Sequence, residues 1–304
     1  MQRRQFLQQT AAASALVGLG GLGLTSFTPE TTKKITILHT NDVHSHIDAF
    51  GPEDGRNPNQ GGVARRATLV ESIRKENPNT LLLDAGDIFQ GTPYFNYYGG
   101  ELEFKLMSML KYDVATIGNH DFDNSIEGLY AQLPHAKFDF VSANYDFSNT
   151  VMDTHVKPYR IIVKDGINIG IFGLGIELDG LVEKRMYKET VYLDPTEAAQ
   201  EMTRILKEDK KCDLIICLSH LGYNYRASSQ KISDLKLAGI TKDIDLIIGG
   251  HTHTFLKKPT VVKNSEGKNM LVNQVGCYGI NLGKIDFYFD ADKNKAASGT
   301  SIIV

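Results

Sequence analysis

Side chains of types that bind metal ions follow five short apolar runs of the sequence. The ligand-type residues after these runs are Asp42, His44, Asp87, Asn119, His120, His220, His251 and His253. Imidazole together with carboxylate suits Zn, Mn or Fe, whereas an all-oxygen set would suit Mg or Ca. None of the three cysteines lies among these residues, which argues against a structural zinc site. The pattern therefore predicts a centre that holds Zn, Mn or Fe.

The spacing of these residues predicts two neighbouring metal ions. Asp42 and His44 are two residues apart, and on extended backbone such a pair points to one side. The same holds for His251 and His253. Asp87 stands alone after its apolar run and is expected to bridge the two ions. Ions ~4 Å apart can hold a phosphate oxygen and a hydroxide together and lower the pKa of the bound water. Hydrolysis of a phosphate ester by metal-bound hydroxide is the reaction that this geometry serves best.

The five apolar runs are expected to be buried strands of a largely parallel sheet. They cover residues 35–40, 80–85, 114–117, 214–219 and 246–248. Short apolar, often β-branched runs that end in glycine or a polar cluster are typical of such strands, and ligands collect beyond their carboxyl ends. A single His or Asp at a strand end is more often a turn residue, so the prediction rests on the five strand ends taken together. His39 lies inside the first run and is expected in the core, while His46 is expected outside direct contact with the metals.

Helices are expected between the strands. Helical spacing of apolar residues or start signals predict helices over residues 62–77, 100–111, 194–210 and 228–238. The third has a strong start, with Asp194 as cap and Pro195 at the first position. Residues 260–262, 270–275 and 284–289 are expected to form antiparallel strands. The predicted architecture is therefore α/β, with two packed sheets flanked by helices.

The motifs, taken together, resemble those of the calcineurin-like metallophosphoesterases. They are Asp42-x-His44, Gly86-Asp87, Gly118-Asn119-His120-Asp121, His220 and Gly250-His251-Thr252-His253. Finer matches at residues 39–42, 86–93, 118–123 and 142–144 resemble the catalytic domain of the 5′-nucleotidase branch. The resemblance runs from about residue 34 to about residue 290 and implies a four-layer α/β/β/α sandwich.

The resemblance also implies a role for each site residue. One metal would be held by Asp42, His44, Asp87 and His253. The other would be held by Asp87, Asn119, His220 and His251. His120 would stabilise the transition state or protonate the leaving alkoxide, oriented by Asp123, because a carboxylate fixes the tautomer of an imidazole and favours its protonated form. The family more often has Glu at the position of Asp121.

The amino terminus resembles a twin-arginine export signal. Arg3 and Arg4 precede an uncharged run rich in Ala, Gly and Leu, so residues 1–27 are expected to direct the chain to the periplasm. The run is too short and glycine-rich for a membrane span, but an uncleaved signal anchor and a disordered basic segment stay open as alternatives. Residues 28–304 are expected to form a single catalytic domain. The odd number of cysteines and their placement predict no disulfide.

The charge of the chain argues against nucleic acid as a partner. The net charge is −3, and without the two arginines of residues 1–27 the remainder carries −5, with no basic run. The expected substrate is a small phosphoester, most simply a nucleotide.

Three interpretations of the activity stay open. Two-domain 5′-nucleotidases have a second domain that supplies base-stacking aromatics and phosphate-binding arginines, and the sequence stops where that domain would begin. The chain could be a nucleotidase whose second domain is a separate polypeptide, a broader phosphomonoesterase or phosphodiesterase, or a metal-holding binding protein without turnover. His120 and Asp123 argue against the third. No paired aromatics are recognisable beside the site motifs, and Arg65 and Arg66 are expected on a solvated helix face.

Overall fold

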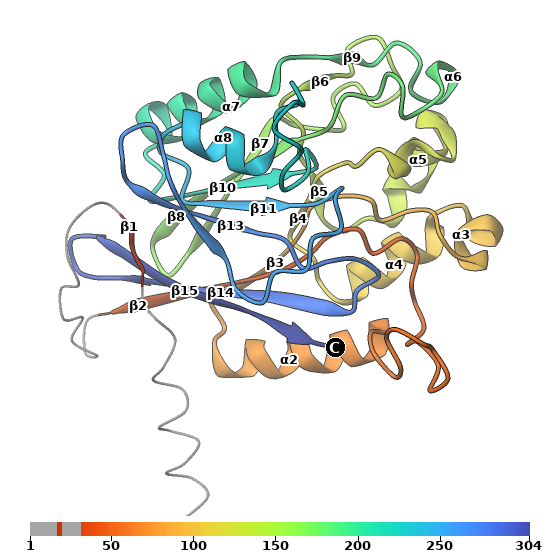
Figure 1. Cartoon of the computed structure of the whole chain (residues 1–304), viewed down its shortest axis with the longest axis horizontal. Coiled ribbons are helices and arrows are strands. Elements are labelled where there is room, and N and C mark those ends of the chain that lie inside the picture. Colours follow the sequence, from red (N-terminus) through yellow and green to blue (C-terminus); the bar gives the residue numbers. More distant parts are fainter. Residues whose placement is uncertain (1–16, 20–31) are drawn as a thin grey trace, which may run out of the picture.

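Two β-sheets lie face to face in the structure, a computed structural model that describes residues 17–19 and 32–304 (Figure 1). The first sheet has the order β1 (Val17–Leu19), β15 (Lys295–Ile303), β14 (Asn281–Phe289), β2 (Lys33–Thr40), β3 (Thr80–Asp84), β4 (Val114–Ala115) and β5 (Asp139–Phe140). The second has the order β12 (Thr260–Lys263), β13 (Asn269–Asn273), β11 (Leu246–Gly249), β10 (Leu214–Ser219), β8 (Ile167–Leu174) and β7 (Tyr159–Lys164). A separate pair consists of β6 (Tyr145–Asp146) and β9 (Val191–Tyr192).

Parallel pairing dominates the centre of each sheet, as the apolar runs predicted. Strands β2, β3, β4 and β5 are parallel to one another, and so are β8, β10, β11 and β13. The five runs that precede site residues do not, however, share one sheet. Three of them are β2, β3 and β4 of the first sheet, and two are β10 and β11 of the second. The rim that carries the site is therefore built by both sheets.

The core is divided into three apolar layers. The inner faces of both sheets pack together through side chains such as Ile37, Leu83 and Ile216. On the outer face of the first sheet lie helices that include α2 (Val63–Glu76), α4 (Glu101–Met109) and α5 (Ser125–Gln132). The outer face of the second sheet packs against α7 (Pro195–Arg204) and α8 (Asp234–Ile240) (Figure 1). This confirms the α/β/β/α sandwich.

His39 is a core residue, as predicted. It is fully buried in β2, and its Nε2 lies 2.8 Å from Asn273 Nδ2 on the second sheet. Burial lowers the pKa of His39 to about 3, because the interior disfavours the imidazolium. The neutral ring therefore joins the two sheets and takes no part in the metal centre.

The predicted helices form, with differences at their ends. Asp194 accepts hydrogen bonds from Thr196 N at 2.7 Å and Glu197 N at 3.0 Å, as expected of the cap, and α7 continues into a π-helical turn, η4 (Ile205–Asp209). The helix expected over 228–238 begins later, at α8, because the Ser233 side chain accepts from Lys236 N and caps it there. The remaining helical segments are α3 (Pro93–Tyr98), α6 (Lys184–Tyr187), η2 (His120–Phe122) and η3 (Leu133–His135).

The carboxy-terminal strands are antiparallel at β12 and β14, but β13 pairs parallel with β11.

The three cysteines, Cys212, Cys217 and Cys277, are buried free thiols. Most of the segment predicted to be an export signal lies outside the described residues, apart from β1, which pairs antiparallel with β15. Within the described residues, no helix has the length and apolarity needed to cross a membrane.

Candidate metal centre

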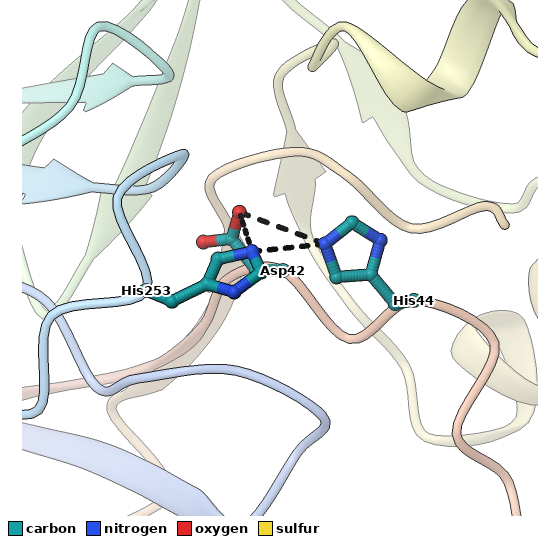
Figure 2. A group of neighbouring side chains, drawn as sticks. All are labelled: Asp42, His44 and His253. Carbon is teal, nitrogen blue, oxygen red and sulfur yellow. Dashed lines mark hydrogen bonds and ion pairs between the residues drawn. The ribbon is translucent and has the colours of Figure 1, made fainter. Parts of the chain in front are cut away.

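Two groups of ligand-type side chains meet at the rim shared by the two sheets. The first group consists of Asp42, His44 and His253, and the second of Asp87, His220 and His251. Within each group the candidate ligand atoms all lie within 4.8 Å of one another. The groups coincide with the two ligand sets that the sequence predicted, apart from Asn119 and the second use of Asp87. Figure 2 shows the first group, with its three side chains pointing toward one another, Asp42 and His44 from the loop after β2 and His253 from the loop after β11.

The first group has the spacing of ligands around a single cation. The His44 and His253 Nε2 atoms are 3.1 Å apart, and His253 Nε2 is 3.4 Å from Asp42 Oδ1 (Figure 2). Ligands of a tetrahedral ion with bonds of about 2 Å lie roughly 3.3 Å apart, so these atoms fit one ion. The other ring nitrogen of His44, Nδ1, is 3.2 Å from the Phe89 carbonyl oxygen, to which it can donate. That bond would leave the Nε2 lone pair free for a metal.

The second group contains a buried nitrogen that lacks a hydrogen bond. His220 donates from Nδ1 to the Ala85 carbonyl at 2.7 Å, while its fully buried Nε2 has no aligned partner. This Nε2 lies 3.1 Å from Asp87 Oδ2, so a lone pair and a carboxylate oxygen converge on one point. His251 Nδ1 and Asn119 Oδ1 are also close, at 2.9 Å. The donor set fits a cation that imidazole, carboxylate and amide oxygen share.

Atoms of the two groups approach each other within 4 Å. Asp87 Oδ2 is 3.7 Å from His44 Nε2, and Asp42 Oδ1 is 3.9 Å from His220 Nε2. The other oxygen of Asp87 accepts the backbone N–H of His120 at 2.8 Å, which fixes the carboxylate. Oδ2 of Asp87 therefore faces histidines of both groups, which is the place that a bridging ligand needs.

The electrostatics at two histidines of the centre, His220 and His253, favour positive charge. Burial disfavours an imidazolium at His220, but the carboxylates of Asp87 and Asp42 outweigh it and raise the pKa of His220 to about 10. Hydrogen bonds with Asp42 and with the Cys277 thiol raise the pKa of His253 to about 10. Burial would raise the pKa of Asp87, yet the neighbouring imidazoles hold it below its usual range. Either protons or metal cations must supply the positive charge, and either would bind at the same lone pairs of the imidazole nitrogens.

The backbone of the ligand residues is left-handed rather than extended. Positive φ angles occur at Asp42 (50°), His44 (49°), Asp87 (56°), His251 (71°) and His253 (50°). The expectation that each pair stands on extended backbone is therefore wrong, and these side chains converge because the chain turns sharply at all five residues. Non-glycine residues in this region are uncommon and cost about 1–3 kcal/mol each. Such strain is typical of functional sites.

Asp121 supports the loop that carries Asp87, a role that the sequence did not indicate. Its carboxylate is buried and accepts four backbone N–H groups, those of Asp87 (3.0 Å), Ile88 (2.8 Å), Phe89 (3.1 Å) and Gly118 (2.8 Å). Burial and the charge of Asp87 raise the pKa of Asp121 to about 7, while the N–H donors lower it. The polar residue after Gly118-Asn119-His120 was the available signal, but apart from Gly118 its partners are far away in sequence.

Removing the Asp121 carboxylate should destabilise the protein. Asp121→Ala would leave buried N–H groups without an acceptor, each costing about 1–3 kcal/mol. We expect the free energy of unfolding to fall by at least about 2 kcal/mol in urea titrations of the metal-free protein. Asp179→Ala is the matched control, because Asp179 is exposed. Equal midpoints for the two variants would contradict the role of Asp121.

Asn41 and Gln274 hold the loops around the first group. Asn41 donates from Nδ2 to Asp42 Oδ2 and to the Gly276 carbonyl, both at 2.6 Å, and its Oδ1 accepts from Val275 N at 3.0 Å. Gln274 bonds to the backbone of the loop that contains His251 and His253. These amides join three loops, so the geometry of the ligands depends on side chains that are not ligands themselves.

His120 and Asp123 form a pair beside the metal groups. His120 Nδ1 is 2.8 Å from Asp123 Oδ2, and the His120 ring lies 5.3 Å from that of His44. The hydrogen bond to Asp123 raises the pKa of His120, although burial opposes this. The His120 side chain is 38% exposed, so it borders the opening of the site. The pair thus presents an imidazole with a raised pKa at the edge of the centre.

The chain is similar to known phosphoesterases. The profile of the calcineurin-like phosphoesterase family matches residues 35–255. The trifunctional nucleotide phosphoesterase protein YfkN of Bacillus subtilis is 35% identical over 288 residues, which cover 84% of this chain and 18% of that protein. The snake venom 5′-nucleotidase of Crotalus adamanteus is 33% identical over 293 residues, which cover 89% of this chain and 48% of the relative.

A solved structure agrees with these relatives. The 5′-nucleotidase precursor from Thermus thermophilus superposes with a TM-score of 0.79 at 36% identity, covering 90% of this chain and 55% of that one. The family profile and the superposition thus agree on the fold of the chain. The chain belongs to the calcineurin-like phosphoesterase family, and it spans about half the length of the venom relative and less of the Bacillus relative.

Proposed function

We propose that this protein is a 5′-nucleotidase-type phosphomonoesterase that uses two divalent metal ions, Zn, Mn or Fe. The observation that carries the proposal is the approach of the two ligand groups within 4 Å, with Asp87 facing both. One ion would be held by Asp42, His44, Asp87 and His253. The other would be held by Asp87, Asn119, His220 and His251. Bound ions would polarise the phosphoryl oxygens and lower the pKa of a water, which supplies the attacking hydroxide.

The chain's own residues would position the ester and move the proton. His120 borders the opening, where its imidazolium could hydrogen-bond a phosphoryl oxygen or protonate the leaving alkoxide. Asp123 orients the ring through Nδ1, leaving Nε2 to face the substrate. The backbone N–H of His120 donates to Asp87, so the proposed acid and the proposed bridging ligand are joined across two loops.

The names of the relatives support nucleotides as substrates, because those relatives are called nucleotide phosphoesterases or 5′-nucleotidases. The Bacillus relative is called trifunctional, which favours a broader phosphomonoesterase or phosphodiesterase as the second candidate. We also propose that residues 28–304 form one catalytic domain and that residues 1–27 act as a twin-arginine signal for export to the periplasm. The Thermus neighbour is called a precursor, in agreement with export.

A substrate panel tests the proposed activity. The metal-loaded protein would be assayed with AMP, a cyclic nucleotide, a sugar phosphate and an aryl phosphate, with a chelator-treated sample as control. Phosphate release from AMP that needs the metal supports the nucleotidase. Cleavage of the cyclic nucleotide in preference to AMP favours the phosphodiesterase, and no turnover of any ester would contradict the proposal. A candidate partner chain, added in titration, should raise activity on AMP selectively if it supplies further nucleotide contacts.

The pH profile tests the role of Asp123. If the protonated ring of His120 is the active form, activity falls as the pH rises through its pKa, which Asp123 holds above the ordinary 6.5. Asp123→Asn should therefore shift this fall to lower pH, whereas well below pH 6.5 the ring is protonated in both proteins and the difference shrinks. The profile of kcat/KM against pH measures the shift. A variant that loses activity equally at all pH values would show that Asp123 acts in another way.

A further inference from the structure

Three aromatic rings from distant parts of the sequence gather beside the metal centre. The His46 ring stacks on Phe50, with centroids 5.1 Å apart and an interplanar angle of 23°. Tyr278 lies 4.3 Å from His46 and 6.2 Å from Phe50. We call these three side chains the aromatic wall. It corrects the expectation that no paired aromatics lie near the site motifs, since residues 46 and 278 meet only in the fold.

The aromatic wall borders the first metal group directly. The centroid of Tyr278 is 6.0 Å from that of His44 and 5.9 Å from that of His253. All three rings of the wall are partly exposed, and so is His253. A phosphoryl group held by the metal ligands would thus have aromatic surface within reach of the group that it carries.

The loop holds Tyr278 in a fixed but strained position. Its N–H donates to the Asp42 carbonyl at 2.7 Å, and its φ is +61°, a left-handed conformation that is costly for a tyrosine. Beneath the loop, Arg66 is 4% exposed and fills the space next to Gly279, leaving no room for a Cβ there. Arg66 is therefore buried beside the loop that carries Tyr278 and does not lie on a solvated helix face as expected. The hydrogen bond from the Tyr278 N–H to the Asp42 carbonyl holds Tyr278 next to a candidate ligand of the first group.

We propose that the aromatic wall is a binding subsite for the flat ring of the phosphoester substrate, a nucleobase or an aryl group. The inference rests on the proposed function, because the phosphoryl group must bind at the metal ligands. Stacking on tyrosine, phenylalanine and imidazole tolerates any planar ring, since each ring has a π-face, and it adds binding energy remote from the reacting phosphorus. The subsite would make this chain selective for ring-bearing phosphomonoesters.

Kinetics of Tyr278 variants test the subsite. Tyr278→Ala should lower kcat/KM roughly 5- to 30-fold for AMP and for p-nitrophenyl phosphate, the range expected for one lost stacking contact. Ribose 5-phosphate and glycerol 2-phosphate have no aromatic ring, so their kcat/KM should change by less than about twofold. Tyr278→Phe keeps the ring and should behave like the wild type. Tyr97→Ala is the matched control, since Tyr97 is a tyrosine that is 83% exposed on α3.

Equal losses of kcat/KM on all four esters would overturn the proposal, because they would mean that Tyr278 only supports the ligand loop. An unchanged kcat/KM for every ester would overturn it too. Phe50→Ala provides a second variant with the same expected selectivity, because Phe50 follows the ligands of the first metal group in the β2–α2 loop and is not one of them. Calorimetric binding of adenosine gives a reading without turnover, and its Kd should weaken about 5- to 30-fold in Tyr278→Ala. If the wild type hydrolyses no ester, the proposed function fails, while adenosine binding that is unchanged in the variant overturns the subsite alone.

Discussion

Replacing His120 with Asn is expected to lower kcat by roughly 10²–10⁴, the usual effect of losing an acid–base or charge-stabilising group. The fold and the two bound metals should be retained, because the His120 ring lies outside both ligand groups and contributes its backbone N–H to Asp87. That N–H is present in the Asn variant too, so the loss should be confined to turnover. Steady-state kinetics combined with metal analysis of the same sample measures both quantities.

The comparison with His135→Asn controls for the loss of an imidazole. His135 lies in η3 beside α4, away from the metal groups, and its replacement should leave kcat unchanged. A His120→Asn protein that contains one metal ion instead of two would show that His120 is a ligand and that its assigned role is wrong.

Replacing Asp87 with Ala should abolish the binding of both metal ions and with it all activity. The carboxylate faces His220 at 3.1 Å and His44 at 3.7 Å, so its loss removes an anion from both sites at once. Two cations would then lie close together without the negative charge between them. Metal analysis after dialysis is expected to give two ions per chain for the wild type and none for the variant.

Asp123→Ala is the matched control for this experiment, since Asp123 is a carboxylate of the same centre that contacts only His120 among the site residues. It should keep both ions. Two ions retained in Asp87→Ala would contradict the bridging role, and a wild type with a single ion would contradict the second site.

The fold could be predicted because its signals are local. The apolar residues Leu81, Leu82 and Leu83 are buried in β3, and Asp194 with Pro195 starts α7 as such residues do. The helix expected from residue 228 starts only at Asp234, because the Ser233 side chain accepts from Lys236 N and caps α8 there. The sequence also could not assign each strand to one of the two sheets, since parallel strands of either sheet have the same apolar pattern.

The candidate site residues could be selected from the sequence, but the residues that hold them in place could not. Every predicted metal ligand lies at the shared rim, because strand ends deliver them there. The hydrogen bonds of Asp121 and the stacking of His46 with Tyr278 depend on contacts between distant segments. The left-handed backbone at the ligands is likewise imposed by the surrounding loops, because side-chain type favours other conformations there. Sequence pattern therefore selected the candidate ligands, and packing determines their geometry.

The most direct test is a titration of metal-free protein with Mn²⁺ while the hydrolysis of AMP is followed. The two ligand groups should fill together as one catalytic unit, so activity is expected to be absent in the metal-free protein and to reach its plateau at two equivalents per chain. A plateau at one equivalent, or hydrolysis by the metal-free protein, would contradict the proposal that the two groups hold two ions acting on one phosphate.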